Sequence, residues 1–386
     1  MTPSHGLPKT SRTAIISKFN EPLEIVELPV PELVPGSLLV EIELSTVCGS
    51  DVHLWDGSLN ATTRPIELPV VPGHEMIGRV VAFGSDEARV DSVGTGLEVG
   101  DRIVWTNAAC GNCHDCVVTG QTNLCRNRHG HLSVKANKHP YIVGGWSQYA
   151  YVFPNSGRIR VPDDVKTEWA SAASCALRSV ITGFQRLGVI EPWQTVVIQG
   201  SGPLGLFSTA IASHSGAGRI IVVGAPESRL ELARDWGATD TISVSGHPDP
   251  ASRVQAVQEL TDGLGAEIVI EASGARSAFG EGLEMVRRGG RFVVVGQVGP
   301  QEVTIRPSRL TAGQLTVLGS FSGETAQYWR ALQFLSSTKH KFDFDRLISN
   351  RYHLDEATVA MAKMKSLEEI KPVVVPTLVG ERVGNS

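Results

Sequence analysis

A glycine motif between a strand and a helix is the feature that most constrains the fold. The apolar run 195–198 leads into Gly200-Ser201-Gly202-Pro203-Leu204-Gly205, and a helical pattern follows. In this setting Gly200 permits a tight turn, Gly202 lets the backbone approach a pyrophosphate, and Gly205 allows close helix–strand packing. The helix N-terminus adds amide donors and a positive dipole end. We expect a dinucleotide site on Gly200, Gly202, Pro203, Leu204 and Gly205; the alternative is a glycine-rich turn without a ligand.

Two kinds of strand pattern divide the chain. Continuous apolar runs at 195–198, 219–223, 268–270 and 291–295 alternate with helical segments. Strands that are apolar on both faces belong to a parallel sheet covered by helices, which predicts a doubly wound Rossmann domain. Across 12–161, short apolar alternations broken by Gly and Pro predict an antiparallel, barrel-like β domain. The predicted class is therefore α/β with two domains.

The length of 386 residues also exceeds what one hydrophobic core usually serves. We place a catalytic domain at 1–176 and 322–386 and the Rossmann domain at 177–321. A helix at about 325–336 and a last strand at 372–375 return the chain to the first domain. The longest loops are expected at 85–98 and 126–145, and the second of these is expected to border the mouth of the active site.

Four of the six cysteines form a cluster with the spacing C-x2-C-x2-C-x8-C. They are Cys110, Cys113, Cys116 and Cys125, in a lobe at about 107–128. Four thiolates this close satisfy the tetrahedral geometry of a closed structural zinc site. No export signal is readable in 1–13, so we expect a cytoplasmic protein with reduced thiols that bind metal, rather than disulfides.

The other two cysteines point to a second, catalytic zinc. Cys48 lies in Cys48-Gly49-Ser50-Asp51, upstream of Gly73-His74-Glu75, which is the composition of an open metal site with one position left for substrate. Cys175 is the remaining candidate for the third ligand. The alternative to metal binding is a structural role for each residue. Cys48 would then be a small buried residue, His74 a turn histidine and Cys175 a buried cysteine in a helix. At such a site, zinc helps an alcohol to lose its hydroxyl proton near neutral pH, which prepares it to release a hydride.

The choice between NAD and NADP depends on the end of the second Rossmann strand. An acid normally stands there and binds the adenosine ribose of NAD, but this chain has Gly224. Arg229 is a candidate for pairing with the NADP phosphate, and Glu227 is a candidate to replace the missing acid; Arg229 as a solvated helix residue is the alternative. No Arg or Lys immediately follows Gly224, so we favour NAD.

The charge balance limits the partners. The chain has 35 basic and 40 acidic residues, a net charge of −5. It has neither a basic run to follow a nucleic acid nor a polybasic amphipathic segment for a membrane surface. We expect a small-molecule partner.

Together these motifs resemble the zinc-dependent medium-chain dehydrogenase/reductases over about 13–376. The resemblance implies a GroES-like catalytic domain, with Cys48, His74 and Cys175 as catalytic zinc ligands and Glu75 as the acid beside the metal. A cysteine as third ligand resembles the alcohol dehydrogenase branch, whereas polyol and threonine dehydrogenases typically have an acid there. Two features depart from the family: eight residues instead of seven between Cys116 and Cys125, and Gly224.

The resemblance also implies a proton path and a further cofactor contact. Ser50 accepts the substrate proton and passes it through the cofactor ribose to His53, which delivers it to solvent. The alternatives are a helix-capping Ser50 and a plain surface histidine. Lys371 matches a basic residue that contacts cofactor phosphates, and an exposed lysine before a strand is the alternative.

For the substrate, the resemblance nominates Trp55, Trp105, Thr106, Asn107 and the segment after Gly296. Two tryptophans and few charges suit an apolar or cyclic secondary alcohol, unless the tryptophans belong to the core. The predicted function is hydride exchange between such an alcohol and NAD(P), with two zincs per chain. The resemblance also implies a homodimer or homotetramer. The alternatives are a polyol or amino-alcohol dehydrogenase of sorbitol or threonine type and a non-catalytic nucleotide-binding relative.

Overall fold

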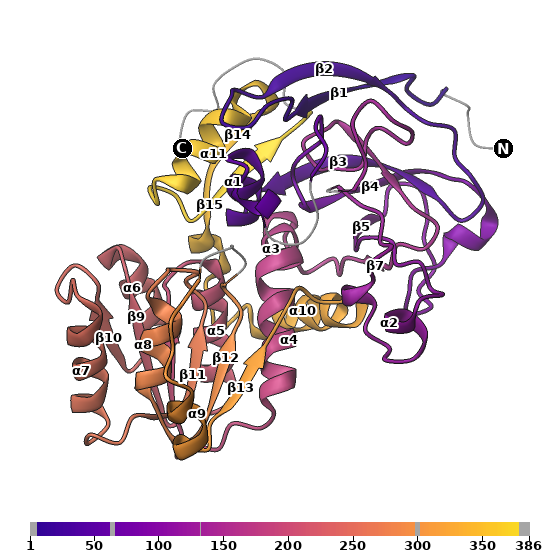
Figure 1. Cartoon of the computed structure of the whole chain (residues 1–386). Coiled ribbons are helices and arrows are strands. Elements are labelled where there is room, and N and C mark those ends of the chain that lie inside the picture. The colour runs from indigo at the N-terminus through magenta and orange to yellow at the C-terminus, as the bar shows by residue number, and fades with distance from the viewer. Residues whose placement is uncertain (1–5, 62–65, 132, 298–301, 378–386) are drawn as a thin grey trace. The chain divides into compact units, whose positions relative to one another are not determined.

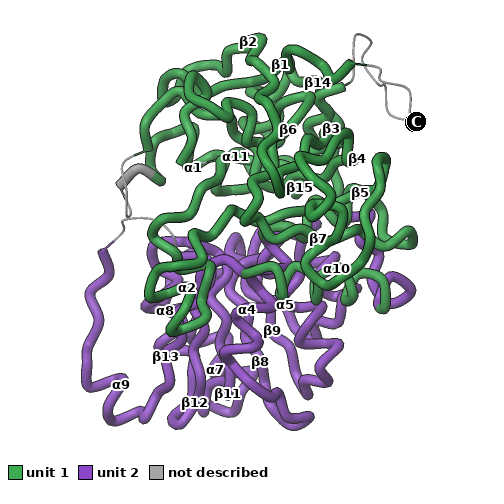
Figure 2. The backbone as a smooth tube through the Cα atoms, turned by 90° about the vertical axis from the view of Figure 1, so that its right-hand side faces the viewer, with its two compact units in different colours: residues 1–175, 324–337, 347–386 green, residues 176–323, 338–346 purple. Residues whose placement is uncertain are grey.

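The computed structural model describes residues 6–61, 66–131, 133–297 and 302–377, and its contacts divide the chain into two compact units (Figures 1 and 2). Unit 1 comprises 1–175, 324–337 and 347–386, and unit 2 comprises 176–323 and 338–346. The segment 338–346 was expected in the first domain. It belongs to unit 2 because the rings of Phe342 and Phe344 pack on Trp236, with centroids 5.9 and 5.5 Å apart.

Unit 2 is built on a parallel sheet of six strands in the order β10-β9-β8-β11-β12-β13. The strands are β8 (Thr195–Gln199), β9 (Arg219–Gly224), β10 (Asp240–Ser243), β11 (Ala266–Glu271), β12 (Val286–Val294) and β13 (Thr316–Gly319). All neighbouring pairs are parallel, and Val196, Val197 and Ile198 of β8 have no solvent exposure. The prediction of a doubly wound fold from continuous apolar strands is confirmed.

Helices accompany the strands of this sheet, as Figure 1 shows. They are α4 (Arg178–Leu187), α5 (Pro203–His214), α6 (Glu227–Asp235), α7 (Pro250–Leu260), α8 (Ala278–Met285) and α9 (Pro307–Gly313). Proline opens α5, α7 and α9, where its missing N–H costs no hydrogen bond. At α7 the carboxylate of Asp249 also accepts a hydrogen bond from the Ser252 N–H at 2.9 Å, which caps the helix.

Unit 1 contains a mainly antiparallel sheet of seven strands and a separate antiparallel pair, β1–β2. The strands are β1 (Thr10–Ile15), β2 (Glu24–Pro29), β3 (Leu38–Thr46), β4 (Glu75–Phe83), β5 (Arg102–Trp105), β6 (Tyr149–Val152), β7 (Arg158–Arg160), β14 (Ile348–His353) and β15 (Lys371–Val375). The sheet has the order β14-β15-β3-β4-β5-β7, with β6 paired to β3. Among the described strands of this sheet, β14 and β15 are the pair that runs parallel. The predicted GroES-like β domain is confirmed.

The helices of unit 1 are short except for one. They are α1 (Gly49–Trp55), α2 (His114–Val117), α3 (Thr167–Ala172), α10 (Thr325–Thr338, of which the last residue belongs to unit 2) and α11 (Ala357–Lys365). A π-helical turn at Ala173–Leu177 follows α3. Short 3₁₀ turns lie at Ser58–Ala61, Asp86–Arg89, Thr122–Leu124, Phe344–Leu347 and Leu354–Glu356.

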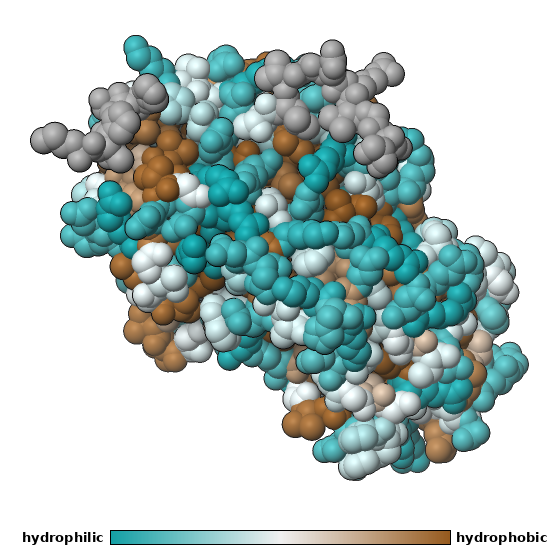
Figure 3. All heavy atoms as spheres, turned by 180° about the vertical axis from the view of Figure 1, so that it is seen from behind, coloured by the Kyte–Doolittle hydropathy of each residue, from teal (hydrophilic) through white to brown (hydrophobic). Residues whose placement is uncertain are grey.

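The surface mixes polar and apolar side chains. On the face shown in Figure 3, hydrophobic residues form separate patches among hydrophilic ones. In the described part of the chain, the helices all lack the combination of length and apolar character that crossing a membrane requires.

Candidate active site and metal centres

Two groups of metal-binding side chains come together in unit 1. One contains Cys110, Cys113, Cys116 and Cys125, and the other contains Cys48, His74, Glu75 and Cys175. Within each group all ligand atoms lie within 4.8 Å of one another. Among the described residues these two groups are the sites that could hold a metal ion, and they contain every residue named as a zinc ligand from the sequence.

The four-cysteine group has the spacing of a closed zinc site. The Sγ atoms of Cys113 and Cys116 lie 3.5 Å apart, those of Cys113 and Cys125 3.9 Å, and those of Cys110 and Cys125 3.5 Å. A tetrahedron with Zn–S bonds of about 2.3 Å has S–S edges of about 3.8 Å. The backbone N–H of Asn112, hydrogen-bonded to Cys110, lowers the pKa of that thiol to about 6, which favours the thiolate that zinc binds.

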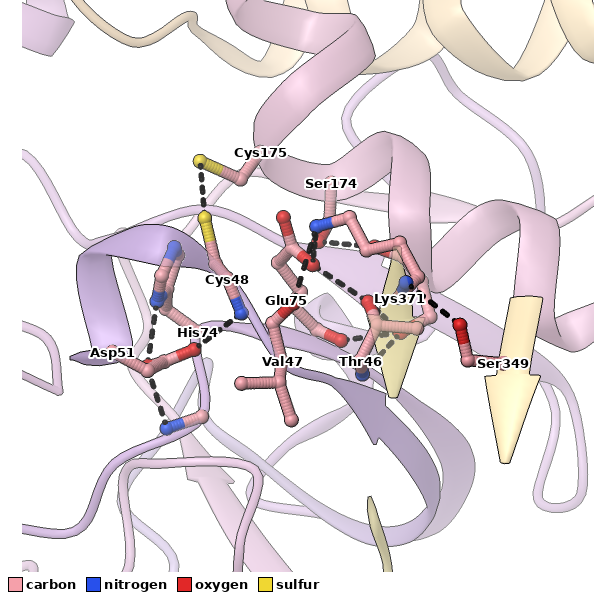
Figure 4. Close-up of polar contacts among 12 residues, drawn as sticks. Thr46, Val47, Cys48, Asp51, His74, Glu75, Ser174, Cys175, Ser349 and Lys371 are labelled. Carbon is pink, nitrogen blue, oxygen red and sulfur yellow. Dashed lines mark hydrogen bonds and ion pairs between the residues drawn. The ribbon is translucent and has the colours of Figure 1, made fainter. Parts of the chain in front are cut away.

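The second group collects residues from distant parts of the chain (Figure 4). Cys48 immediately precedes α1, Glu75 opens β4, and Cys175 lies in the π-helical turn after α3. Thr46 pairs with Glu75 across β3 and β4, so the end of β3 brings Cys48 beside His74. Cys48 and Cys175 then approach to 3.9 Å between their Sγ atoms, again close to the edge of a zinc tetrahedron.

Asp51 orients this group, and the sequence reasoning did not assign it a role. Its fully buried carboxylate accepts hydrogen bonds from Nδ1 of His74 at 3.0 Å, the Gly73 N–H at 3.2 Å and the Cys48 N–H at 3.0 Å. Because Nδ1 is engaged, Nε2 of His74 is left to bind a metal, as in carboxylate–histidine–zinc arrangements. The signal in the sequence was its position, three residues after Cys48 in the first turn of a helix.

The turn before His74 requires glycine. Gly73 has φ = +86°, a conformation that residues with a Cβ rarely adopt. A Cβ at this position would also lie 2.8 Å from Nε1 of the buried Trp146. The close packing of Gly73 against Trp146 therefore fixes the backbone position of His74, the next residue.

Glu75 is fully buried and only partly neutralised. Its Oε2 accepts hydrogen bonds from Nζ of Lys371 and from Oγ1 of Thr46, the latter at 2.6 Å. Its Oε1 is buried without a hydrogen-bond partner among the described residues. Burial raises the pKa of Glu75, and the paired ammonium of Lys371 acts against this rise.

Lys371 is not the exposed lysine allowed as an alternative. It is the first residue of β15, has no solvent exposure, and contacts Glu75 and the Val47 carbonyl. Its contact with a cofactor phosphate stays a prediction.

Charge is concentrated at the cysteine–histidine group. The hydrogen bond with Cys175 lowers the pKa of Cys48 well below its ordinary value and raises that of Cys175. Burial would lower the pKa of His74, but Asp51 and Cys48 outweigh it, so this pKa is raised. Two sulfur atoms, one imidazole nitrogen and the carboxylate oxygen Oε1 of Glu75 form a donor set that suits zinc. The residues present therefore fit a zinc ion held by Cys48, His74 and Cys175, with Glu75 beside it.

The two residues of the expected proton path lie on α1. Ser50 is the second residue of this helix and Cys48 is at its N-cap, so the alternative of a capping Ser50 is wrong. His53 is exposed, and its Nδ1 lies 3.0 Å from Oγ of Ser58. The proton path stays a prediction.

In unit 2 the glycine loop has the geometry that a pyrophosphate site requires. Gly200 has φ = +110°, and a Cβ on Gly205 would collide with the Gly200 carbonyl. A Cβ on Gly202 would meet no protein atom within 4 Å, so the protein leaves space beside this backbone. The loop leads into α5, whose N-cap residue Gly202 offers no side chain to its amides. These features fit a bound dinucleotide.

The end of β9 explains the absence of an acid at 224. A Cβ on Gly224 would lie 2.6 Å from Cβ of Ser201, whose hydroxyl donates to the Ala225 carbonyl at 2.9 Å. Ser201 thus occupies the space of a side chain at 224. Arg229 is only 4% exposed, so its interpretation as a solvated helix residue is wrong, and Glu227 forms an ion pair with Arg234 at 2.6 Å.

The residues nominated for the substrate lie in the core, at the end of helix α1 and in loops. Trp105 belongs to the core cluster of β3, β4 and β5, which is the alternative that the sequence left open. Trp55 donates from Nε1 to the Glu21 carbonyl at 2.6 Å, and Thr106 contacts Thr325. Asn107 packs against Gly130 in the long loop 126–145. The segment after Gly296 lies outside the described residues from 298 to 301.

Comparison with known proteins identifies the family. A family model described as zinc-binding dehydrogenase matches residues 203–337, and one described as alcohol dehydrogenase GroES-like domain matches 34–163.

The 5-exo-hydroxycamphor dehydrogenase of Pseudomonas putida is 33% identical, over 95% of this chain and 99% of that protein. An L-threonine 3-dehydrogenase of Escherichia coli is 29% identical, over 92% and 97%. The crystal structure of an alcohol dehydrogenase from Thermotoga maritima matches with a TM-score of 0.86 and 32% identity, over 95% and 99%. The chain therefore belongs to the zinc-dependent medium-chain dehydrogenase/reductase family.

Proposed function

We propose that this protein is a zinc-dependent alcohol dehydrogenase that transfers a hydride between an apolar or cyclic secondary alcohol and NAD(P). The observation that carries the proposal is the convergence of Cys48, His74 and Cys175 beside a carboxylate oxygen that has no protein partner among the described residues. A closed structural site would use four protein ligands, whereas three leave a position for substrate.

The donor group suits the chemistry of alcohol oxidation. A zinc ion held there would supply Lewis acidity, which lowers the pKa of a bound alcohol. Asp51 keeps His74 in one tautomer and orientation, and the buried Lys371 balances the charge of Glu75. Ser50 takes the alcohol proton, and the exposed His53 passes it to solvent.

The proposed substrate class is supported by one relative and by the residue type of the third candidate ligand. The P. putida relative is named for a hydroxycamphor, a cyclic secondary alcohol with an apolar skeleton. Cys175 as third ligand favours the alcohol dehydrogenase branch. We therefore propose a secondary alcohol on an apolar, ring-containing skeleton.

A second candidate is an amino-alcohol dehydrogenase. The similarity to L-threonine 3-dehydrogenases, over most of both chains, favours it. The two candidates differ in what the site must hold, because an amino acid substrate needs partners for its ammonium and carboxylate groups.

For the cofactor we propose NAD rather than NADP, bound at Gly200, Gly202, Pro203, Leu204, Gly205 and Gly224. The nicotinamide ring accepts the hydride. Arg229 is nearly buried, so its guanidinium is poorly placed to pair with a 2′-phosphate in solvent.

We also propose a homodimer or homotetramer. β13 is an outer strand of the unit 2 sheet, and Val317 on it is exposed. An open strand edge can pair with the same strand of a second copy. Light scattering on the purified protein gives the subunit number.

Initial rates test the function directly. Cyclic secondary alcohols, linear secondary alcohols, polyols and L-threonine are compared at matched concentrations with NAD and with NADP, and zinc is measured on the same sample. We expect about two zincs per chain and the highest kcat/KM with a cyclic secondary alcohol and NAD. Faster turnover of L-threonine would favour the second candidate, and one zinc with no turnover would favour a non-catalytic relative.

A further inference from the structure

A histidine outside the ligand group lies flat against one of its members. The rings of His131 and His74 are stacked, with centroids 5.0 Å apart and planes inclined by 15°. His131 is 7% exposed. It is not among the residues whose ligand atoms gather within 4.8 Å. His131 therefore contacts a metal ligand without being one.

Hydrogen bonds hold the backbone of Gly130, directly before His131. The Gly130 N–H donates to Oγ of Ser133 at 2.8 Å, and the Ser133 N–H donates to the Gly130 carbonyl at 3.0 Å. A Cβ on Gly130 would lie 2.5 Å from Cγ of Asn107, so the backbone is pressed against that side chain. These contacts anchor the backbone at Gly130, the residue before His131, and link it to Ser133.

The base of the turn is tied to the four-cysteine lobe. His129 and Ala108 exchange backbone hydrogen bonds of 2.9 and 2.8 Å as an antiparallel bridge. Ala108 lies two residues before Cys110, the first ligand of that lobe. A short backbone path therefore runs from the lobe to the ring that covers His74.

A hydrogen bond and a stacked ring restrain different motions of an imidazole. The hydrogen bond to Asp51 holds the Nδ1 edge of His74, but the imidazole ring can still rotate about that bond. The ring of His131, stacked flat on the face of His74, restricts this rotation and so keeps the imidazole in one plane. We propose that His131 is a positioning residue that keeps the ring of His74 in its metal-binding plane. This inference rests on the proposed function, because it requires His74 to bind the catalytic zinc.

The test measures how tightly zinc is held. The zinc-loaded protein and the variants His131→Ala and His131→Phe are titrated with a chelator, and released zinc and thermal melts are recorded. His129→Ala is the matched control, because its side chain is exposed and the bridge uses its backbone. Cys48→Ala, expected to hold one zinc, identifies which release step belongs to the catalytic site.

We expect His131→Ala to release the catalytic zinc at about tenfold lower chelator concentration, the lower end of the loss seen when groups behind metal ligands are removed. His131→Phe keeps a flat ring and should release zinc as the parent and His129→Ala do. In cobalt-substituted protein, the absorption bands of the catalytic site should shift in His131→Ala and not in His131→Phe.

Three results would overturn the inference. One is parental zinc release from His131→Ala, and another is release from His131→Phe as early as from His131→Ala. If His131→Ala does not fold, His131→Leu replaces it, and equal retention of zinc by Leu and Phe would show that bulk rather than a stacked ring is needed. Two zincs in Cys48→Ala would instead contradict the ligand set and with it the proposed function.

Discussion

Lys371 and Glu75 form an ion pair without solvent access, directly beside the cysteine and histidine donors. The two residues are 296 positions apart in the chain. Removing one charge of a buried pair leaves the other unpaired, which typically costs about 3–5 kcal/mol. Lys371→Met should therefore lower the free energy of unfolding by about this amount, measured by denaturant titration, and adding Glu75→Gln should restore part of it. Lys363→Met is the control, because its pair with Glu368 is exposed and screened by solvent, so its loss should change the free energy of unfolding far less.

The two metal sites should respond differently to loss of a cysteine. Cys48→Ala should remove one zinc and abolish turnover while the thermal melt stays close to that of the parent. Cys113→Ala should remove the other zinc and lower the melting temperature, because a closed zinc site contributes folding free energy. Zinc content, rates and melts measure these outcomes. Activity in Cys48→Ala, or an unchanged melt in Cys113→Ala, would contradict the assigned roles.

Asp51→Asn should weaken the catalytic zinc site without disturbing the fold. The Asn side chain has the size of the Asp carboxylate but no charge. One of the two carboxylate oxygens is replaced by an NH₂ group, which donates hydrogen bonds and would face the N–H donor of Cys48 or Gly73. A loss of about 10–100-fold in zinc affinity is expected, measured by competition with a chelator. Asp56→Asn, at the C-terminal end of the same helix, should bind zinc as the parent does.

Gly224→Asp should fail to improve NAD binding, although it restores the acid usual at this position. Its Cβ would lie 2.6 Å from Cβ of Ser201, so the glycine loop must shift. We expect a loss of about 1–3 kcal/mol in stability and weaker binding of NAD, measured by melting and by fluorescence titration. The double variant with Ser201→Gly should recover stability. Tighter NAD binding by Gly224→Asp alone would disprove this steric explanation.

The ion pair between Arg219 and Asp240 should give unit 2 a defined pH dependence. The two hydrogen bonds from Arg219, of 2.8 and 3.1 Å, lower the pKa of Asp240 in the folded protein. The stabilisation by this ion pair is therefore fully present above about pH 3.9, the ordinary pKa of Asp in an unfolded chain. It is lost as the pH falls through the lower pKa that Asp240 has in the folded protein. Asp240→Asn should cost about 1 kcal/mol at pH 7 and less at pH 3, measured by denaturant titration at both pH values. Glu231→Gln, exposed on α6, should show no such difference.

Much of the fold was readable in the sequence because its signals are local. Apolar runs buried on both faces indicated the parallel sheet, and alternating patterns indicated the β domain. The strands β10 and β13 were not among the predicted runs, since they are short and lie at the two ends of the sheet. The segment 338–346 was placed in the other domain, because its two phenylalanines gave no local sign that Trp236 would be their partner.

The candidate metal ligands were readable for a different reason. Thiols and imidazole are the donors that zinc selects, and most of them lie close together in the chain or beside glycines. Cys175 has no such local signal and was nominated as the remaining cysteine. The glycine loop carried its steric requirement in its own spacing. Residue types and short-range spacing were therefore enough for the fold class, the metal-ligand candidates and the nucleotide loop.

What surrounds those ligands depends on contacts between segments far apart in the chain. Burial of Lys371 against Glu75, stacking of His131 on His74, and Ser201 in the space beside Gly224 all arise when separate strands and loops pack together. No local spacing encodes these contacts, because each depends on the distance and direction at which two remote backbones approach. The chain alone was sufficient for the chemistry of the donors, whereas three-dimensional packing set their orientation, their charge balance and the positions of the groups behind them.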